Sequence, residues 1–301
     1  MTAPTLTGGT SHAGRARRRQ AVLRRTVLSV GTVAMLVPVV ALLEYSVRFP
    51  LTGAVDLSAW RKIVAGRTTE YQSLAPLWSG LTSSLVMCAL TVAIMLGLLL
   101  PTMVWVRLRA PRAARTLELV CLLPLSIPAV VLVVGLAPVY RFLAGTPLGS
   151  STVWLSFAYV ILVLPFAFRA LDAGLRAIDL VTLAEAARTL GGGWSRILLR
   201  VVVPNLRPAI VSSSFVTVAV VLGEFTVARL LARENLQTAL FQVNLSDSQV
   251  AAAMAFVLLT GTTALLVTLE LLATRTARTA RPRGAEPSRS GVGREPRGDH
   301  R

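Results

Sequence analysis

Six long runs without a charged residue constrain this chain more than any other feature. A hydrocarbon core about 30 Å thick is crossed by roughly 20 residues of helix. Each run is long enough to form most or all of such a helix. The runs cover residues 26–43, 71–106, 119–140, 142–168, 208–223 and 248–269. We therefore expect an all-α, polytopic membrane protein with six transmembrane helices.

The composition fits a lipid bilayer better than a nucleic-acid partner. Only 15% of the residues are charged and 54% are hydrophobic, whereas soluble domains carry about a quarter charged residues. The net charge of +17 could suggest nucleic acid. The charges are crowded between the apolar runs, however, and do not spread over a soluble surface. We expect the lipid bilayer as a partner and no nucleic acid.

Two of the runs need adjustment before they can be read as helices. The second and fourth runs begin with polar residues, so we place these spans at 77–105 and 152–168. The fifth run, 208–223, would reach only about 24 Å as a helix. We therefore expect its helix to continue past Glu224. This places a carboxylate at or near membrane depth, where ionisable groups are costly and often functional.

Arginine placement predicts the orientation, since cytoplasmic loops carry an excess of basic residues. The amino-terminal tail, the loop at 107–118, the segment 169–207 and the tail after 274 hold 24 of the 31 basic residues. We expect both termini to be cytoplasmic and residues 1–20 and 275–301 to be disordered. The first run could instead be a cleavable signal peptide. Its length and the lack of a clear cleavage site favour a retained span.

Residue types that the chain lacks exclude several activities. Lys62 is the only lysine, and no glycine run precedes it, so the chain has no phosphate-binding loop for ATP. Two histidines and two cysteines, His12, His300, Cys88 and Cys121, lack metal-ligand spacing. We expect a non-enzymatic chain without a catalytic residue, a metal or a cofactor.

The stretch 175–208, between the fourth and fifth spans, is the most informative. Thr182 and Glu185 have the spacing of a capping box, which predicts a helix start. The helix is expected to stop at Gly191, the first of three glycines. So short a helix needs a partner surface. We expect its apolar positions to form one docking side, made of Leu183, Ala186, Ala187 and Leu190.

A second short helix is expected after the glycines. Ser195 could cap a helix over 196–202 that ends before Pro204. The two helices would form a bent hairpin beneath the membrane.

This hairpin resembles the cytoplasmic signature of the inner-membrane permease subunits of binding-protein-dependent ABC importers. That signature is Glu-Ala-Ala, three residues, Gly, nine residues, then Ile-x-Leu-Pro. The chain has Glu185-Ala186-Ala187, then Gly191, then Val201-Val202-Val203-Pro204 at the same spacing. Valine replaces the isoleucine and leucine, which keeps the positions apolar.

The resemblance implies a type I ABC importer transmembrane fold in the bacterial plasma (inner) membrane. The chain would form half of a solute pathway. Its partners would be a separate ABC ATPase subunit, a second permease chain that is the same or similar, and an extracytoplasmic solute-binding protein. The domains implied are a basic cytoplasmic tail at 1–25, a permease domain at 26–272 with its coupling loop at 170–204, and a disordered basic cytoplasmic tail at 273–301.

The resemblance also assigns residues to the contact with the ATPase. Glu185 would touch the ATPase, the alanines would permit close docking, Gly191 would make the turn and Pro204 would end the hairpin. Glu185 could instead be only a capping acid, Pro204 a plain helix terminator, and Trp194 an anchor at the lipid interface. The full set is Glu185, Ala186, Ala187, Leu190, Gly191, Trp194 and Pro204.

Near the end of the fifth run, Gly223-Glu224-Phe225 resembles permeases for polyamines, iron, thiamine, phosphonates and some oxyanions. Glu224 would line a gate or balance a cationic solute; alternatively it marks the helix end or pairs with Arg229. Ser212, Ser213 and Ser214 could bind solute or allow close helix packing. We expect a small polar or charged solute and a pathway that includes Glu224, Ser212, Ser213 and Arg229.

The alternative function is an ion-gradient-driven secondary carrier. Such a carrier would be expected to show related halves and paired broken helices with polar groups. Neither is visible in the sequence.

Overall fold

The structure is a computed structural model that describes residues 10–48, 53–69, 72–145 and 151–279. Regular structure in these residues is almost entirely helical, so the predicted all-α class is confirmed. Strands within them are limited to a short antiparallel pair, β1 (Arg67–Thr69) and β2 (Gln72–Ser73).

Long helices build the body of the chain, and shorter ones connect them. The long helices are α1 (Thr10–Val47), α3 (Ala75–Arg109), α6 (Leu155–Arg176), α10 (Arg207–Gly223) and α13 (Ser248–Thr279). The shorter ones are α2 (Ser58–Ala65), η1 (Pro111–Ala113), α4 (Ala114–Leu122), η2 (Leu123–Ser126), α5 (Ala129–Ala144), η3 (Thr152–Trp154), α7 (Leu180–Thr189), α8 (Trp194–Arg196), η4 (Ile197–Val202), α9 (Val203–Asn205), α11 (Thr226–Leu230) and α12 (Leu236–Ser246).

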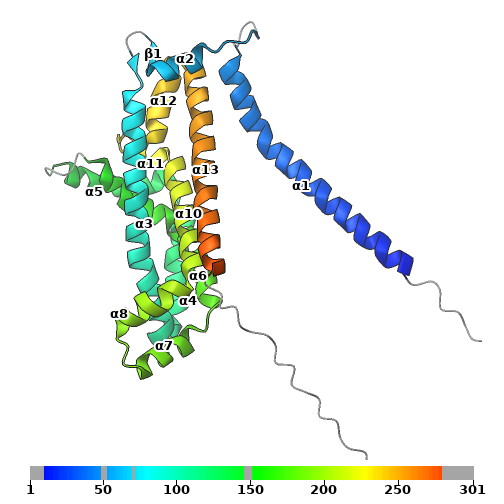
Figure 1. Cartoon of the computed structure of the whole chain (residues 1–301). Helices are drawn as coiled ribbons and strands as arrows, with labels where there is room; N and C mark the ends of the chain where they lie inside the picture. Colours follow the sequence, from blue (N-terminus) through cyan, green and yellow to red (C-terminus); the bar gives the residue numbers. More distant parts are fainter. Residues whose placement is uncertain (1–9, 49–52, 70–71, 146–150, 280–301) are drawn as a thin grey trace, which may run out of the picture.

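Helices α3, α6 and α10 pack against one another and enclose the main core. On α3 every fourth residue from Met87 to Met103 is buried, which is the spacing of one helix face. Helix α12 lies against α3, and α13 returns along α12 and α10. Figure 1 shows α2 and β1 at one end of this bundle and α7 and α8 at the other. We refer to these as the α2 end and the α7 end.

Apolar helical segments occupy all six predicted places in the described residues. By length and composition, Arg19–Val47, Ala75–Arg109 and Thr152–Arg176 could each cross a membrane. Two bent pairs raise this number to five if each counts as one span: Pro111–Ser126 with Ala129–Ala144, and Trp194–Asn205 with Arg207–Gly223. The shorter apolar helix Ser248–Ala264 lies at the sixth place.

The third predicted span, 119–140, is not one continuous helix. The helix axis bends by 102° between its two parts. Ile127, which lies between them, has extended backbone with φ −102° and ψ 118°. Ile127 precedes Pro128, and the residue before a proline is pushed out of the helical conformation. Figure 1 shows α5 projecting sideways from the bundle.

Helix also extends into the tails that we expected to be disordered. Helix α1 begins at Thr10 and α13 continues to Thr279. The predicted disorder is therefore wrong for these parts of the tails. The remaining predicted tail residues, 1–9 and 280–301, lie outside the described residues.

A second, smaller core closes the α2 end. It is formed by residues of α2, α3, α12 and α13 and includes Ala59, Leu77 and Met254. The Lys62 ammonium group donates to the Asp247 carboxylate at 2.6 Å. This ion pair ties α2 to the corner between α12 and α13. Helix α1 packs on α13 at the same end, where the hydroxyls of Tyr45 and Ser248 lie 2.9 Å apart, and it diverges from the bundle below this contact (Figure 1).

Candidate functional site

Helix α7 begins at Leu180 and is capped by Asp179, which corrects the predicted capping box. The Asp179 carboxylate accepts hydrogen bonds from the Thr182 hydroxyl at 2.7 Å and the Thr182 backbone N–H at 3.2 Å. These bonds hold the pKa of Asp179 below its ordinary value. Thr182 thus donates to the cap and does not form it. Glu185 is exposed on α7 and does not act as a capping acid.

Helix α7 ends at the predicted glycine turn, in a Schellman motif. Gly191 has φ +74°, a left-handed conformation that other residues resist. Its N–H donates to the Arg188 carbonyl at 2.9 Å, and the Gly192 N–H donates to the Ala187 carbonyl at 2.8 Å. A Cβ on Gly192 would lie 2.6 Å from that Ala187 oxygen, whereas one on Gly193 would meet nothing within 4 Å. The turn therefore requires the first two glycines but not the third.

The second helix of the hairpin starts earlier and runs further than the predicted 196–202. It begins at Trp194 without a side-chain cap, so Ser195 is not the cap. It then continues through η4, a π-helical turn, and α9. Pro204 lies in this last turn and has no N–H to donate to the turn before it. A 79° bend toward α10 follows at Leu206, so Pro204 precedes the bend and does not end the helix.

The four apolar positions of the predicted docking side share one side of α7 by their spacing but differ in exposure. Ala186 and Leu190 are exposed, while Leu183 and Ala187 are half-buried and Ala187 packs against the main core. Leu183 and Ala187 form the inner edge of this side, and its docking role stays a prediction. Glu185 lies on the exposed side with Ala186.

Exposed apolar side chains occur on both helices of the hairpin. Leu190 is 86% exposed and Trp194 is 37% exposed, and Val181 and Leu199 are exposed as well. They lie at the α7 end, where Figure 1 shows the two helices below the bundle. Exposed apolar surface of this kind is typical of contacts with another protein or with the membrane.

Charged groups join the ends of α3 and α6 beside the hairpin. The Asp172 carboxylate binds the guanidinium groups of Arg107 from α3 and Arg176, one turn further along α6; the Arg176 bond is 2.7 Å long. Arg107 also donates to the Asp172 carbonyl at 3.4 Å. A half-buried carboxylate between two arginines thus ties α3 to α6, the helix that leads into the hairpin.

The fifth predicted helix stops at Gly223 and does not continue past Glu224. Glu224 has extended backbone, with ψ 124°. Its carboxylate accepts hydrogen bonds from the N–H groups of Val227 at 2.7 Å and Ala228 at 3.3 Å, which begin α11. Glu224 thus marks the helix end, one of the two alternatives. In the described residues Arg229 forms no ion pair with it and lies over the Phe241 ring, 5.4 Å from its centre.

The serines of α10 differ in their surroundings. Ser212 is exposed, Ser213 is fully buried and Ser214 is half-buried. The Ser213 hydroxyl donates to the Ile210 carbonyl at 2.9 Å. Ser213 is thus occupied within its own helix, while Ser212 lies on a face of α10 that this chain leaves uncovered.

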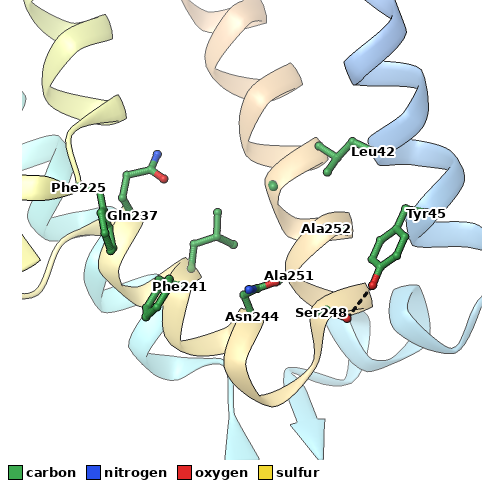
Figure 2. Close-up of a pocket in the computed structure, with 11 residues that line it drawn as sticks. Leu42, Tyr45, Phe225, Gln237, Phe241, Asn244, Ser248, Ala251 and Ala252 are labelled. Atoms are coloured by element: carbon green, nitrogen blue, oxygen red, sulfur yellow. Dashed lines mark hydrogen bonds between the residues drawn. The ribbon is translucent and has the colours of Figure 1, made fainter. Parts of the chain in front are cut away.

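Two cavities lie beside the interruption between α10 and α12. The larger, about 510 Å³, is lined by α1, α12, α13 and Phe225; the smaller, about 240 Å³, is lined by residues that include Arg229 and Arg233. The rings of Phe225 and Phe241 are 5.3 Å apart. Figure 2 shows both on one wall of the larger cavity, facing Leu42 and Tyr45 of α1 across it.

The described residues contain no group of three histidine, cysteine or acidic side chains that could hold a metal ion. Cys88 and Cys121 are both buried as free thiols.

Comparison with known proteins agrees with this architecture. Residues 89–278, well over half of the chain, match the family described as "Binding-protein-dependent transport system inner membrane component". The chain belongs to this family. It is therefore a multi-pass plasma-membrane protein and an inner membrane component of a binding-protein-dependent transport system. The matched region contains the hairpin, both cavity-lining phenylalanines and the Asp172 ion pairs.

A similar protein is the methionine import system permease protein MetP of Bacillus subtilis (strain 168). The two are 34% identical over 103 residues. The aligned segment covers 34% of this chain and 45% of the relative, so the chain spans less than half of that protein's length.

Several residues that shape these sites are not apparent from the sequence. Asp179 could have been found, because Asp-x-x-Thr is also a helix-start pattern. Asn235 binds the Tyr159 hydroxyl, and the neighbouring Leu236 N–H binds the Ser84 hydroxyl. These partners lie far apart in the sequence, so no spacing links them.

Proposed function

We propose that this chain forms half of a solute pathway and that the hairpin of α7 and α8 couples it to a separate ATPase subunit. A second permease chain, the same or similar, supplies the other half, and an extracytoplasmic solute-binding protein delivers the solute. The observation that carries the proposal is the hairpin itself. Its turn is fixed by Gly191 and Gly192, and it presents Glu185, Ala186 and Leu190 outward at one end of the bundle.

The hairpin is built to transmit force to the bundle. Ala184 is fully buried and Ala187 packs on the core, so α7 is attached to the body of the chain. Helices α8, η4 and α9 lead through the 79° bend into α10. A displacement of the exposed face would therefore reach α10, which ends at Gly223, just before Glu224 and the cavity-lining Phe225.

The three glycines allow a sharp test of coupling. In Gly192→Ala the new Cβ must displace the Ala187 carbonyl oxygen, so the hairpin should open. We expect about tenfold weaker ATPase association, which corresponds to about 1.4 kcal/mol, and a matching loss of ATP-driven uptake. Both are measured in membranes that contain the full-length chain and its ATPase.

The matched control is Gly193→Ala, whose Cβ has open space and which should keep association and uptake near the parent values. Glu185→Ala leaves the fold of α7 intact and removes one exposed contact, so it should weaken association as well. Full transport in both Gly192→Ala and Glu185→Ala would refute the coupling role.

For the solute we propose a small polar or charged molecule, such as a polyamine, iron, thiamine or a phosphonate, on the resemblance around Glu224. The name of the Bacillus subtilis relative adds methionine as a second candidate. Competition among these five in ATP-driven uptake decides between them. Uptake that follows an ion gradient and ignores ATP would favour the secondary carrier.

A further inference from the structure

Asn235 occupies the interruption between α10 and α12 and is 1% exposed. Its carboxamide oxygen accepts a hydrogen bond from the Thr238 N–H at 2.8 Å and thereby caps α12. Its carboxamide nitrogen donates to the Glu224 carbonyl at 2.6 Å and to the Tyr159 hydroxyl at 3.2 Å. The buried Asn235 carboxamide thus makes three hydrogen bonds, one through its oxygen and two through its nitrogen.

These bonds reach several elements of the bundle. Tyr159 belongs to α6, and Glu224 directly follows α10. The next residue in the chain, Leu236, donates its N–H to the Ser84 hydroxyl of α3 at 2.9 Å. The start of α12 is thus attached to α3, α6 and the end of α10 at a single buried point.

The two functions of the Asn235 carboxamide are separable. Capping α12 uses only the oxygen, and serine supplies an equivalent oxygen at this position. The nitrogen does nothing for α12; both of its bonds cross to other elements. A side chain needed only to start a helix would have no reason to make them.

The Glu224 carbonyl that Asn235 binds directly precedes a residue that lines the larger cavity. Phe225 follows it directly and packs against Phe241 of α12, with the Arg229 guanidinium on the Phe241 ring. The Phe225–Phe241 pair lines the larger cavity, and Arg229 lines the smaller one. Figure 2 shows Phe225 on the segment before α12 and Phe241 within α12, on the same side of the cavity.

We propose that Asn235 is a positioning residue of the transport pathway: its carboxamide nitrogen holds the chain break at Glu224 so that Phe225 and Phe241 close the pathway above α10. This inference rests on the proposed function, because it assumes that solute passes along α10 and α12. It adds Asn235 as the residue that holds the Phe225–Phe241 barrier in place. The Tyr159 hydroxyl is the second group that the Asn235 carboxamide nitrogen binds.

A cysteine on α10, before the chain break at Glu224, can report whether the pathway is closed. Ala219 and Gly223 are exposed on one side of the helix, four residues apart. We place a single cysteine at Ala219 and add the membrane-impermeant thiol reagent MTSET to right-side-out vesicles that contain the full-length chain and its ATPase. The parent should react slowly. Asn235→Ser keeps the cap but loses both cross-element bonds, and should react about tenfold faster.

Thr238→Val is the matched control. It removes the hydroxyl that accepts from the Asn235 N–H at 2.8 Å and so weakens the same helix start. It leaves the carboxamide nitrogen bonds in place, and its reaction rate should stay within about twofold of the parent. A chain without the Ala219→Cys change gives the background from Cys88 and Cys121, which are buried.

The outcomes separate clearly. Parent-like labelling of Asn235→Ser overturns the proposal, and so does equal acceleration in Asn235→Ser and Thr238→Val, which would mean that only the α12 cap matters. If Asn235→Ser fails to insert, Tyr159→Phe decides: it removes one support and should react about threefold faster. Labelling needs neither ATP hydrolysis nor solute, so this inference and the coupling proposal fail separately.

Discussion

Gly174 lies where α6 and α10 come close together. A Cβ at this position would lie 2.3 Å from the Cβ of Ala209, far inside van der Waals contact. Ala209 is itself buried, so it cannot swing away. Small residues at such crossings let membrane helices approach each other.

Replacing Gly174 with alanine should therefore force α6 and α10 apart. Overpacking of this kind costs roughly 1–3 kcal/mol, and we expect a lower unfolding temperature of the detergent-solubilised chain. The double variant Gly174→Ala with Ala209→Gly should regain most of the loss, because it moves the methyl group to the other helix. Failure of this rescue would contradict the close approach.

Gly97 provides the control for Gly174. It lies inside α3, and a Cβ there would meet nothing within 4 Å. Gly97→Ala should leave the unfolding temperature unchanged or raise it slightly, since alanine favours helix over glycine.

The sequence could predict which residues form the hairpin but not how deeply each of them is buried. The fixed spacing from Glu185 to Pro204 located both helices and the glycine turn. The burial of Ala187 could not be predicted, because it depends on how α7 lies against the bundle. Asn235 and Tyr159 are 76 residues apart, and such a pair becomes visible only in the folded chain.

At the scale of single elements, the cap of α7 makes a prediction about pH. The folded-state pKa of Asp179 is lowered by its bonds from Thr182, so the ionised carboxylate stabilises α7 at neutral pH. This contribution is present above the unfolded-state value of about 3.9 and is lost as the pH falls through the folded-state pKa. Hydrogen exchange of α7 peptides should show constant protection between about pH 5 and 7 and a decline only below about pH 4.

Asp179→Asn is the matched variant for this measurement. Asparagine is an equally good helix cap and does not titrate, so its α7 should lose less protection in acid than the parent. The same acid profile in both proteins would assign the decline to another group.

Helix breaks were the least predictable feature of the elements. Charge-free runs locate the apolar segments well, and each predicted place holds one. They do not show where a helix stops within a run. The break at Ile127 depends on Pro128, and the break at Glu224 depends on a carboxylate turned back onto Val227 and Ala228. Pro128 is one of six prolines in or beside the predicted spans, and the sequence does not show which of them breaks a helix. The six are Pro38, Pro101, Pro124, Pro128, Pro138 and Pro165.

At the scale of the whole molecule, the two ends of the bundle should lie on opposite sides of the membrane. The α7 end carries Arg107, Arg176 and Arg188, in the arginine-rich segments that are typical of cytoplasmic loops. The α2 end, with the sole lysine, carries few basic residues. We therefore predict that the α2 end faces outward and that both termini are cytoplasmic.

Two exposed side chains at opposite ends allow a direct measurement of this orientation. Val64 on α2 is 89% exposed and Leu190 after α7 is 86% exposed, so a cysteine at either position is open to reagent without changing the core. In intact cells an impermeant maleimide should label Val64→Cys and leave Leu190→Cys unlabelled until the membrane is permeabilised. The reverse pattern would place the hairpin outside, where no cytoplasmic ATPase could reach it, and would refute the orientation and the coupling proposal together.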